Sequence, residues 1–288
     1  MQIDKVKKNI TIIIVSHKGR EKVIKFVKVL SKKLNILIID NSNDIVLKKK
    51  LKKFQNIKVL FMKNNGYGAA INYARKFVTT EYIFAFSPDV EGVNNRLIFE
   101  FYKKTISKFN FGALGPRFLN VTQKSHVQSD IKKKIGDIKA ISGSAIFINL
   151  RAFDRINGFD ENIFLFFEEN DFCKRLRNIG YKIYQLNNTF IKHPKGVRSG
   201  VVKISRNAEF LKLEQLYNWH FLWSKFYFFK KNYGKLLTLI IFIPIIVRTC
   251  FRIFINSLLK KTNTRKKYLA RFNGLYSSII GRSSFKRL

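Results

Sequence analysis

Five of the chain's eighteen acidic residues stand within residues 160–171, although an even distribution would leave such a stretch almost free of them. The chain has 56 Lys and Arg residues and a formal net charge of +38, so this cluster requires a cause. Its carboxylates are set among phenylalanines, and apolar surroundings raise a carboxyl pKa toward the range useful for base chemistry. The dipole at a helix start accounts only for the later acids. The cluster consists of Asp160, Glu161, Glu168, Glu169 and Asp171.

Three further polar residues, Ser16, Asp40 and Asp89, stand at or just after apolar runs that predict strands. Parallel sheets bind ligands at the carboxyl ends of their strands, so we expect these residues on one edge. A carboxylate there can hold a nucleoside, or a divalent metal together with substrate phosphates. Each aspartate taken alone is more typical of a turn or a helix cap.

The segment from Asn64 to Asn72 carries Gly66 and Gly68 at a predicted helix start. Glycines allow a ligand close to the backbone, and free N–H groups at a helix start attract a diphosphate. Tight helix packing explains the same glycines. His193, which ends a predicted strand, can bind metal or phosphate, although a lone histidine is more often structural.

Regular alternation of apolar strands and amphipathic helices in the first half predicts an α/β fold with a mostly parallel sheet. In the middle, we expect a strand over 141–148 that contains Ser142–Ser144, a helix over 168–178, and short strands over 182–186 and 189–192. In the first half, strands are expected at 10–15, 35–39, 57–61 and 82–86, and helices at 21–34, 66–77 and 96–109.

The tail differs in composition, because residues 215–288 contain no Asp or Glu but fifteen Lys and Arg, with many aromatics. Its apolar run, 236–247, is twelve residues long, whereas a membrane span takes about twenty. Extension would bury Arg248 and Arg252 at about 2.5–3.5 kcal/mol each. We therefore expect a basic helical segment that lies on an anionic membrane surface, the alternative being a helical cap on the core.

Composition limits the classes of function. A hydrophobic content of 46% excludes a disordered chain, and the charge predicts anionic partners such as a membrane, phosphorylated substrates or nucleic acid. Two cysteines provide no disulfide framework or metal spacing, and the N-terminal apolar run is too short for a signal peptide. We expect a cytoplasmic protein.

Taken in order, these segments resemble glycosyltransferase family 2, particularly its bacterial rhamnosyltransferase-like branch. The resemblance runs from Thr11 to about Gly200 and includes Ile36-Leu-Ile-Ile-Asp-Asn-Ser, Asn64-Asn-Gly-Tyr-Gly, Ser87-Pro-Asp-Val, Phe166-Phe-Glu-Glu-Asn-Asp and His193-Pro-Lys-Gly. It implies a GT-A-type nucleotide-diphospho-sugar transferase fold over 1–205, with a nucleotide-binding half of about 1–115 and an acceptor half of about 116–205. A membrane-associating helical region over 206–288 would follow.

The resemblance also implies roles for single residues. Ser87 stands at the first position of the family's metal-binding D-x-D motif and leaves Asp89 as its surviving acid, with His193 as a second ligand for Mg²⁺ or Mn²⁺. The catalytic set would be Glu168, Glu169 and Asp171, with one of the two glutamates as base. The nucleotide-sugar set would be Ser16, Asp40, Asn64, Gly66, Gly68, Ser87 and Asp89, and the acceptor set Gly143, Asp160 and Glu161.

The implied activity is inverting transfer of a sugar from a nucleotide-diphosphate donor to a hydroxyl of a lipid-linked or polysaccharide acceptor, in cell-surface polysaccharide synthesis. dTDP-rhamnose is the first expected donor, with UDP-linked sugars open. The enzyme would be peripheral on the inner face of the plasma membrane, and no nucleic acid is expected as partner. The alternatives are a basic nucleic-acid-binding protein and an inactive family member that serves as a scaffold.

Overall fold

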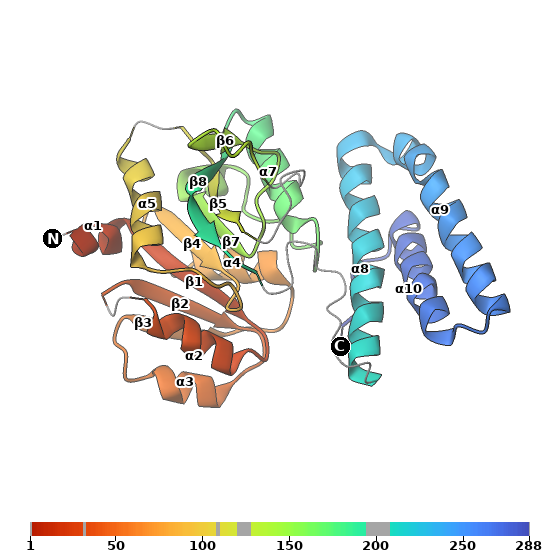
Figure 1. The fold of residues 1–288 in the computed structure, drawn as a ribbon, viewed down its shortest axis with the longest axis horizontal. Coiled ribbons are helices and arrows are strands. Elements are labelled where there is room, and N and C mark those ends of the chain that lie inside the picture. The colour runs from red at the N-terminus through yellow and green to blue at the C-terminus, as the bar shows by residue number, and fades with distance from the viewer. Residues whose placement is uncertain (1, 31–32, 108–109, 120–127, 194–207, 288) are drawn as a thin grey trace. The chain divides into compact units, whose positions relative to one another are not determined.

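The computed structural model describes residues 2–30, 33–107, 110–119, 128–193 and 208–287, which form two compact units (Figure 1). One unit comprises Met1–Glu161 and Glu169–Val197, and the other comprises Asn162–Glu168 and Arg198–Leu288. The short segment 162–168 therefore groups with the C-terminal helices. The domain boundary expected near residue 205 lies outside the described residues.

The first unit is built on an eight-stranded sheet with strand order β3-β2-β1-β4-β7-β5-β8-β6 (Figure 1). Neighbours β1–β2, β1–β4, β2–β3 and β5–β8 are parallel, whereas β7 is antiparallel to both β4 and β5, and β6 is antiparallel to β8. The strands are β1 (Ile10–Ser16), β2 (Asn35–Asp40), β3 (Ile57–Phe61), β4 (Tyr82–Phe86), β5 (Ala113–Phe118), β6 (Ile135–Asp137), β7 (Ala145–Asn149) and β8 (Ile183–Ile191).

Helices cover both faces of this sheet, because its central strands are apolar on both sides. Ile12 and Ile14 of β1 join one apolar core, and Ile13 joins the other. The first core receives residues of α1 (Gln2–Asn9), α2 (Arg20–Lys28), α3 (Ile45–Leu51) and α5 (Asn95–Ile106). The second receives residues of α4 (Tyr67–Arg75), α6 (Leu150–Arg155) and α7 (Glu168–Asn178).

Several sequence-based boundaries are confirmed, including β3, β4 and α7. The strand predicted over 141–148 was wrong at its start, because Ser142–Ser144 precede β7 instead of lying inside it. The two short strands predicted at 182–186 and 189–192 are one strand, β8. The helix predicted over 21–34 ends at Lys28. Elements α1, α3, α6, β5 and β6 were not predicted.

The second unit contains three long helices, α8 (Ala208–Tyr233), α9 (Lys235–Leu258) and α10 (Thr262–Ile279). Helices α8 and α10 cross closely at Gly274, where an added Cβ would lie 2.1 Å from the carbonyl oxygen of Trp219. Only glycine permits this approach. Apolar packing inside the unit centres on Phe226, Phe242 and Leu275.

Helix α9 exposes a continuous apolar stripe along its whole length. The prediction that this segment is too short to cross a membrane needs correction. The twelve-residue run belongs to a helix of 24 residues, which by length and composition is able to cross a membrane. Arg248 and Arg252 are exposed and lie beside the stripe. The stripe consists of Leu236, Ile240, Ile243, Val247, Phe251, Phe254 and Leu258.

Helix α4 packs against the loop after α6 through Gly68, where an added Cβ would lie 2.8 Å from Cβ of Phe159. Because that atom is fixed to the backbone, it cannot rotate away. Packing therefore accounts for Gly68.

We expect Gly68→Ala to lower the free energy of unfolding by about 1–3 kcal/mol, because overpacking outweighs the better helix propensity of alanine. Chemical denaturation of the wild type and the variant measures this difference. An unchanged or higher stability would show that propensity decides at this position and that the contact with Phe159 is relieved at little cost.

Candidate active site

The strand directions bring most of the predicted site residues to one edge of the sheet, here called the carboxyl edge. Strands β1, β2, β3 and β4 are mutually parallel, so Ser16, Asp40 and Asn64 follow or end strands on this edge. Strand β7 is antiparallel to β4, with Ala145 opposite Phe86, and it therefore begins where β4 ends. The common edge predicted for Ser16, Asp40 and Asp89 therefore agrees with the strand directions, since Asp89 follows β4.

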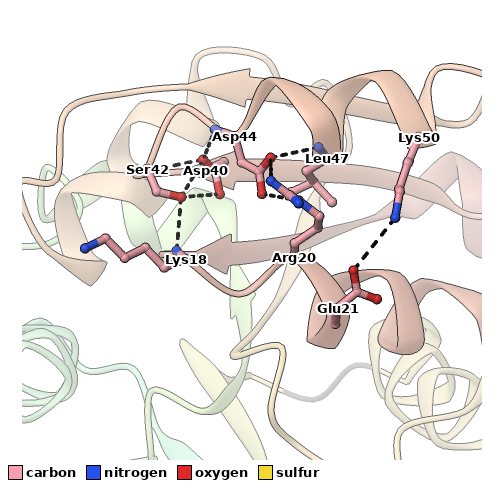
Figure 2. A network of polar contacts seen from close by, with 8 residues as sticks. All are labelled: Lys18, Arg20, Glu21, Asp40, Ser42, Asp44, Leu47 and Lys50. Carbon is pink, nitrogen blue, oxygen red and sulfur yellow. Dashed lines mark hydrogen bonds and ion pairs between the residues drawn. The ribbon is translucent and has the colours of Figure 1, made fainter. Parts of the chain in front are cut away.

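Asp40 organises the loop after β2 (Figure 2). Its buried carboxylate accepts hydrogen bonds from the backbone N–H of Ser42 at 3.0 Å and of Asp44 at 2.9 Å, and from the Ser42 hydroxyl at 3.0 Å. Ser42 Oγ also accepts a bond from the backbone N–H of Lys18. Asp40 therefore stabilises a turn in this structure, as the alternative interpretation of the sequence expects. A nucleoside would bind beside a loop whose conformation these hydrogen bonds already fix.

Asp44 anchors the other end of this loop (Figure 2). It accepts two bonds of 2.7 Å from the Arg20 guanidinium and caps α3 by accepting from the backbone N–H of Leu47. The hydrogen bonds from Arg20 hold the pKa of Asp44 below its ordinary value. Neither residue was among the predicted site residues, and their separation of 24 positions left no sequence signal.

Two buried acceptors beside this loop have no hydrogen-bond partner within the described part of the chain. They are Ser16 Oγ and Asn41 Oδ1. The residues adjoin, because the backbone N–H of Asn41 donates to the carbonyl of Ser16 at 2.8 Å. Unpaired buried acceptors are costly, which is why they commonly mark a place where a ligand donates. Ser16 was predicted, whereas Asn41 was missed although it follows Asp40 directly.

Asp89 and His193 meet at the carboxyl edge, with His193 Nε2 3.4 Å from Asp89 Oδ1. A β-bridge between Glu91 and Lys192 fixes their backbones through bonds of 2.8 and 2.9 Å. Burial raises the pKa of Asp89, but His193, Ser87 and Lys22 outweigh it and hold that pKa well below the ordinary value. Asp89 is therefore ionised at neutral pH.

This pair fits part of a divalent cation site. Oxygen and imidazole ligands suit Mg²⁺ or Mn²⁺, which commonly takes one or two protein carboxylates and completes its shell with substrate phosphates. Among the described residues, no cluster of three or more His, Cys, Asp and Glu forms a complete cage. A cation held here would thus depend on the donor diphosphate for further ligands.

The turn before β7 borders the same edge. The backbone N–H of Ser87 donates to the carbonyl of Ser144 at 2.9 Å, which ties this turn to the end of β4. An added Cβ at Gly143 would lie 3.2 Å from Cε1 of Tyr67, the first residue of α4. Gly143 therefore allows Tyr67 to approach the turn, and Gly66, with φ 102°, allows the chain to enter α4.

The predicted acceptor residues Asp160 and Glu161 follow Phe159 in a loop that Asn72 of α4 holds. The Asn72 side chain bonds to both the N–H and the carbonyl of Phe159, at 2.8 and 2.9 Å, and donates to Glu161 at 2.9 Å. Glu161 is exposed, and Asp160 is half-buried. Asn72 was not predicted.

Helix α7 carries the three predicted catalytic acids in its first turn, in different surroundings. Asp171 is buried and accepts a 2.7 Å bond from Arg175, which also donates to the carbonyl of Ile156. Glu168 is buried at the first position of the helix. Glu169 is half-buried as a residue, but its Oε2 is shielded from water and lacks a hydrogen-bond partner among the described residues.

Burial raises the pKa of Glu169 to about 7, whereas a backbone hydrogen bond opposes this rise. A carboxyl group with such a pKa can accept a proton near neutral pH. Glu169 thus combines a raised pKa with a buried carboxyl oxygen that no described group bonds.

The direction of α7 sets where Glu169 lies. Near its C-terminal end, Leu176 packs on Gly112, where an added Cβ would lie 3.1 Å from Leu176 Cδ1. Gly112 precedes β5 and so lies at the edge opposite to the carboxyl edge. Helix α7 therefore starts on the side of the carboxyl edge. The ring of Phe172 in α7 stacks on the ring of Phe159, with 4.3 Å between the ring centroids. Glu169 and the Asp89–His193 pair belong to the same side of this unit.

Comparisons with known proteins identify similar sequences and similar folds. Residues 11–97 match the model of the family described as Glycosyl transferase family 2. The low-salt glycan biosynthesis hexosyltransferase Agl10 of Haloferax volcanii is 25% identical over 199 residues, which are 62% of this chain and 64% of that protein. The chain thus spans less than two thirds of the length of this relative.

Solved structures share the fold. A mannosyltransferase from Pyrobaculum calidifontis, solved with GDP-Man and Mn²⁺, superposes with a TM-score of 0.60 at 11% identity, over 94% of this chain and 87% of that one. Residues 1–349 of S. aureus TarS, solved with UDP, give a TM-score of 0.54 at 14% identity, over 95% and 92%. The chain thus has a GT-A-like fold with a C-terminal helical region, and its residues 11–97 carry the sequence signature of glycosyltransferase family 2.

Proposed function

We propose that this protein is an inverting glycosyltransferase that moves a hexose from a nucleotide-diphosphate donor to an acceptor hydroxyl. The observation that carries the proposal is the shielded carboxyl group of Glu169, whose raised pKa suits a base, on the same side of the unit as His193 and the ionised Asp89. The match of residues 11–97 to family 2 and the hexosyltransferase relative support it.

In this proposal, the nucleotide lies along the carboxyl edge. Ser16 Oγ and Asn41 Oδ1 accept hydrogen bonds from it, beside the loop that Asp40 and Asp44 hold. Asp89 and His193 would hold Mg²⁺ or Mn²⁺, which would supply positive charge that stabilises a diphosphate leaving group. The open backbone at Gly66 admits the diphosphate at the start of α4.

Glu169 removes the proton of the acceptor hydroxyl as the oxygen attacks the anomeric carbon opposite to the departing diphosphate. The C–O bond to the diphosphate breaks, so the configuration at this carbon inverts. A carboxylate with a pKa near 7 is both ionised in part and basic enough at neutral pH. We assign the base to Glu169, because Asp171 is already bonded to Arg175. Asp160 and Glu161 remain proposed acceptor contacts.

The donor sugar is proposed only as a hexose. The similar proteins are described with GDP-Man, UDP or a hexosyltransferase activity, and none of these three descriptions names rhamnose. The rhamnosyltransferase-like branch and dTDP-rhamnose therefore remain predictions. The acceptor is proposed to be a lipid-linked or polysaccharide glycan, and the name of the hexosyltransferase relative, which mentions glycan biosynthesis, supports a glycan acceptor.

We place the enzyme on the cytoplasmic face of the plasma membrane through α9. The apolar stripe of α9 faces outward, and Arg248 and Arg252 beside it match anionic headgroups. The arginines lie within the helix, which favours a helix in the plane of the interface over one that crosses the bilayer.

Donor binding is tested by thermal unfolding with GDP-mannose, UDP-GlcNAc or dTDP-rhamnose, each with MnCl₂. We expect at least one donor to stabilise the protein, by about 2.7 kcal/mol at 100 times its Kd. Asp89→Asn should abolish the part that depends on Mn²⁺, whereas Glu91→Gln, which alters an exposed side chain in the adjoining bridge, should not. Stabilisation by duplex DNA and by no donor would instead favour a nucleic-acid-binding protein.

Glu169→Gln should lower kcat by about 10²–10⁴-fold while leaving donor binding intact, because only proton removal is lost. Wild-type kcat should rise with pH through a midpoint near 7. Glu81→Gln, at an exposed carboxylate outside the proposed site, serves as the control. Full turnover by Glu169→Gln with loss in Glu168→Gln would transfer the base role to Glu168, and full binding with no wild-type turnover would indicate a scaffold.

Glu169→Gln should also change stability in a pH-dependent way. The folded-state pKa of Glu169 lies above its ordinary value of 4.5, so protonation favours the folded state, and this contribution is lost as pH rises toward about 7. Glutamine does not ionise, so the variant does not lose this contribution to stability as pH rises. Its Tm should therefore exceed that of the wild type at pH 8 by more than at pH 4, which denaturation at the two pH values measures; equal differences would refute the burial of this carboxyl group.

Membrane association is tested by sedimentation with phosphatidylglycerol and phosphatidylcholine vesicles. The wild type should bind the anionic vesicles, in a salt-sensitive manner, and be extracted by alkaline carbonate. Val247→Glu with Phe251→Glu should abolish binding, whereas Ile106→Glu, at a similarly exposed residue of α5, should not. Resistance to carbonate would identify a membrane-spanning helix instead.

A further inference from the structure

The segment just before Glu169 has an unusual backbone. Phe166 has φ 65° and Phe167 has φ 69°. Positive φ is rare for residues with a side chain, and a bulky residue adopts it only when its surroundings enforce it. Two such residues in succession require an external restraint, and strain of this kind is typical of functional sites.

Helix α8 supplies this restraint within the second compact unit. The Ser224 hydroxyl donates to the carbonyl of Leu165 at 2.8 Å, and Ser224 is fully buried. The Phe221 ring contacts Phe166 at 5.8 Å and Phe167 at 5.9 Å between centroids. These contacts hold both strained residues from one side.

Further contacts come from the same side of α8. Tyr217 packs edge-on against Phe166 at 5.9 Å, and Phe228 packs against Phe167 at 5.6 Å. Residues 217, 221, 224 and 228 recur every three or four positions, so they form one stripe of the helix. All four residues of this stripe therefore contact the segment 165–167.

The segment that α8 holds is joined directly to Glu169 along the chain. Segment 162–168 belongs to the helical unit, whereas the α/β unit resumes at Glu169. The residue that receives the proton in the proposed reaction is thus bonded to a segment whose conformation α8 imposes. We propose that α8, through Phe221 and Ser224, is the positioning element for Glu169. This inference rests on the proposed role of Glu169 as the base.

The first test follows hydrogen exchange at the amides of residues 165–171 in the full-length protein. In Phe221→Leu and Ser224→Ala, we expect exchange in this segment to accelerate by about tenfold or more, because the restraint on a locally opening segment is lost. The control is Phe226→Leu, which removes a buried aromatic ring of α8 that packs on Phe242 of α9. Unchanged exchange in both test variants would overturn the proposal.

The second test is kinetic, with release of nucleoside diphosphate from the donor that stabilises the wild type. Phe221→Leu should lower kcat by about tenfold or more, because misplacing a reacting group is costly, while KM for the donor stays unchanged. The midpoint of the kcat–pH profile should move to lower pH as the carboxyl group gains water. Phe221→Tyr, which keeps the ring, should restore kcat.

Equal kcat losses in Phe221→Leu and Phe226→Leu, with the wild-type pH midpoint, would show a merely structural effect and contradict the proposal. If Glu169→Gln keeps full turnover, the base assignment fails, while the exchange test still reports whether α8 restrains the segment. The two failures are therefore distinguishable. Ser224→Ala removes a single hydroxyl, so the test stands even where Phe221→Leu does not fold.

Discussion

The arrangement of the candidate site depends on the register in which strands β4 and β7 pair. Because Ala145 pairs with Phe86 in antiparallel fashion, the turn before β7 lies beside the residues that follow β4. Strand β7 then pairs with β5, and β5 with β8, so the same register determines that His193 reaches Asp89 from far along the chain. A shift of one residue would exchange the two faces of β7 and separate these groups.

The carboxylates of this strongly basic chain differ from one another in their ionisation and in their bonding partners. Asp89 stays ionised because cationic and hydrogen-bonding neighbours surround it, whereas Glu169 resists ionisation because its carboxyl group is buried. Asp44 and Asp171 are each bonded to an arginine and act as ties. Four acids thus have distinct tasks, and surroundings determine each task more than residue type does.

The sequence predicted the local features well and the long-range ones poorly. Strand β4 and helix α7 were located correctly, because apolar runs and an acidic helix start are local signals. Strand β5 was missed because Gly115, Pro116 and Arg117 interrupt its apolar pattern. Strand β8 was divided in two because Asn187 and Asn188 are typical of turns, but their neighbours pair with β5 across an irregular register.

The same distinction holds for the site. The common edge followed from strand direction, and the resemblance named Asp89 and His193 together, but their distance depends on pairings that no spacing reveals. Asn72 and the Arg20–Asp44 pair were missed, since their partners lie far away in the chain. Asn41 was missed because its Oδ1 has no partner among the described residues that a pattern could have indicated. The positive φ values of Phe166 and Phe167 had no signal, because phenylalanine seldom adopts them.

The grouping of Asn162–Glu168 with the C-terminal helices has a consequence for how this protein evolves. The polypeptide passes from one unit to the other more than once, so the helices are not a detachable appendix. A recombination event that replaced the last third of the gene would leave Phe164, Phe166 and Phe167 without their aromatic partners. The C-terminal helices and the segment 162–168 are therefore expected to be inherited together and to accumulate compensating substitutions as a pair.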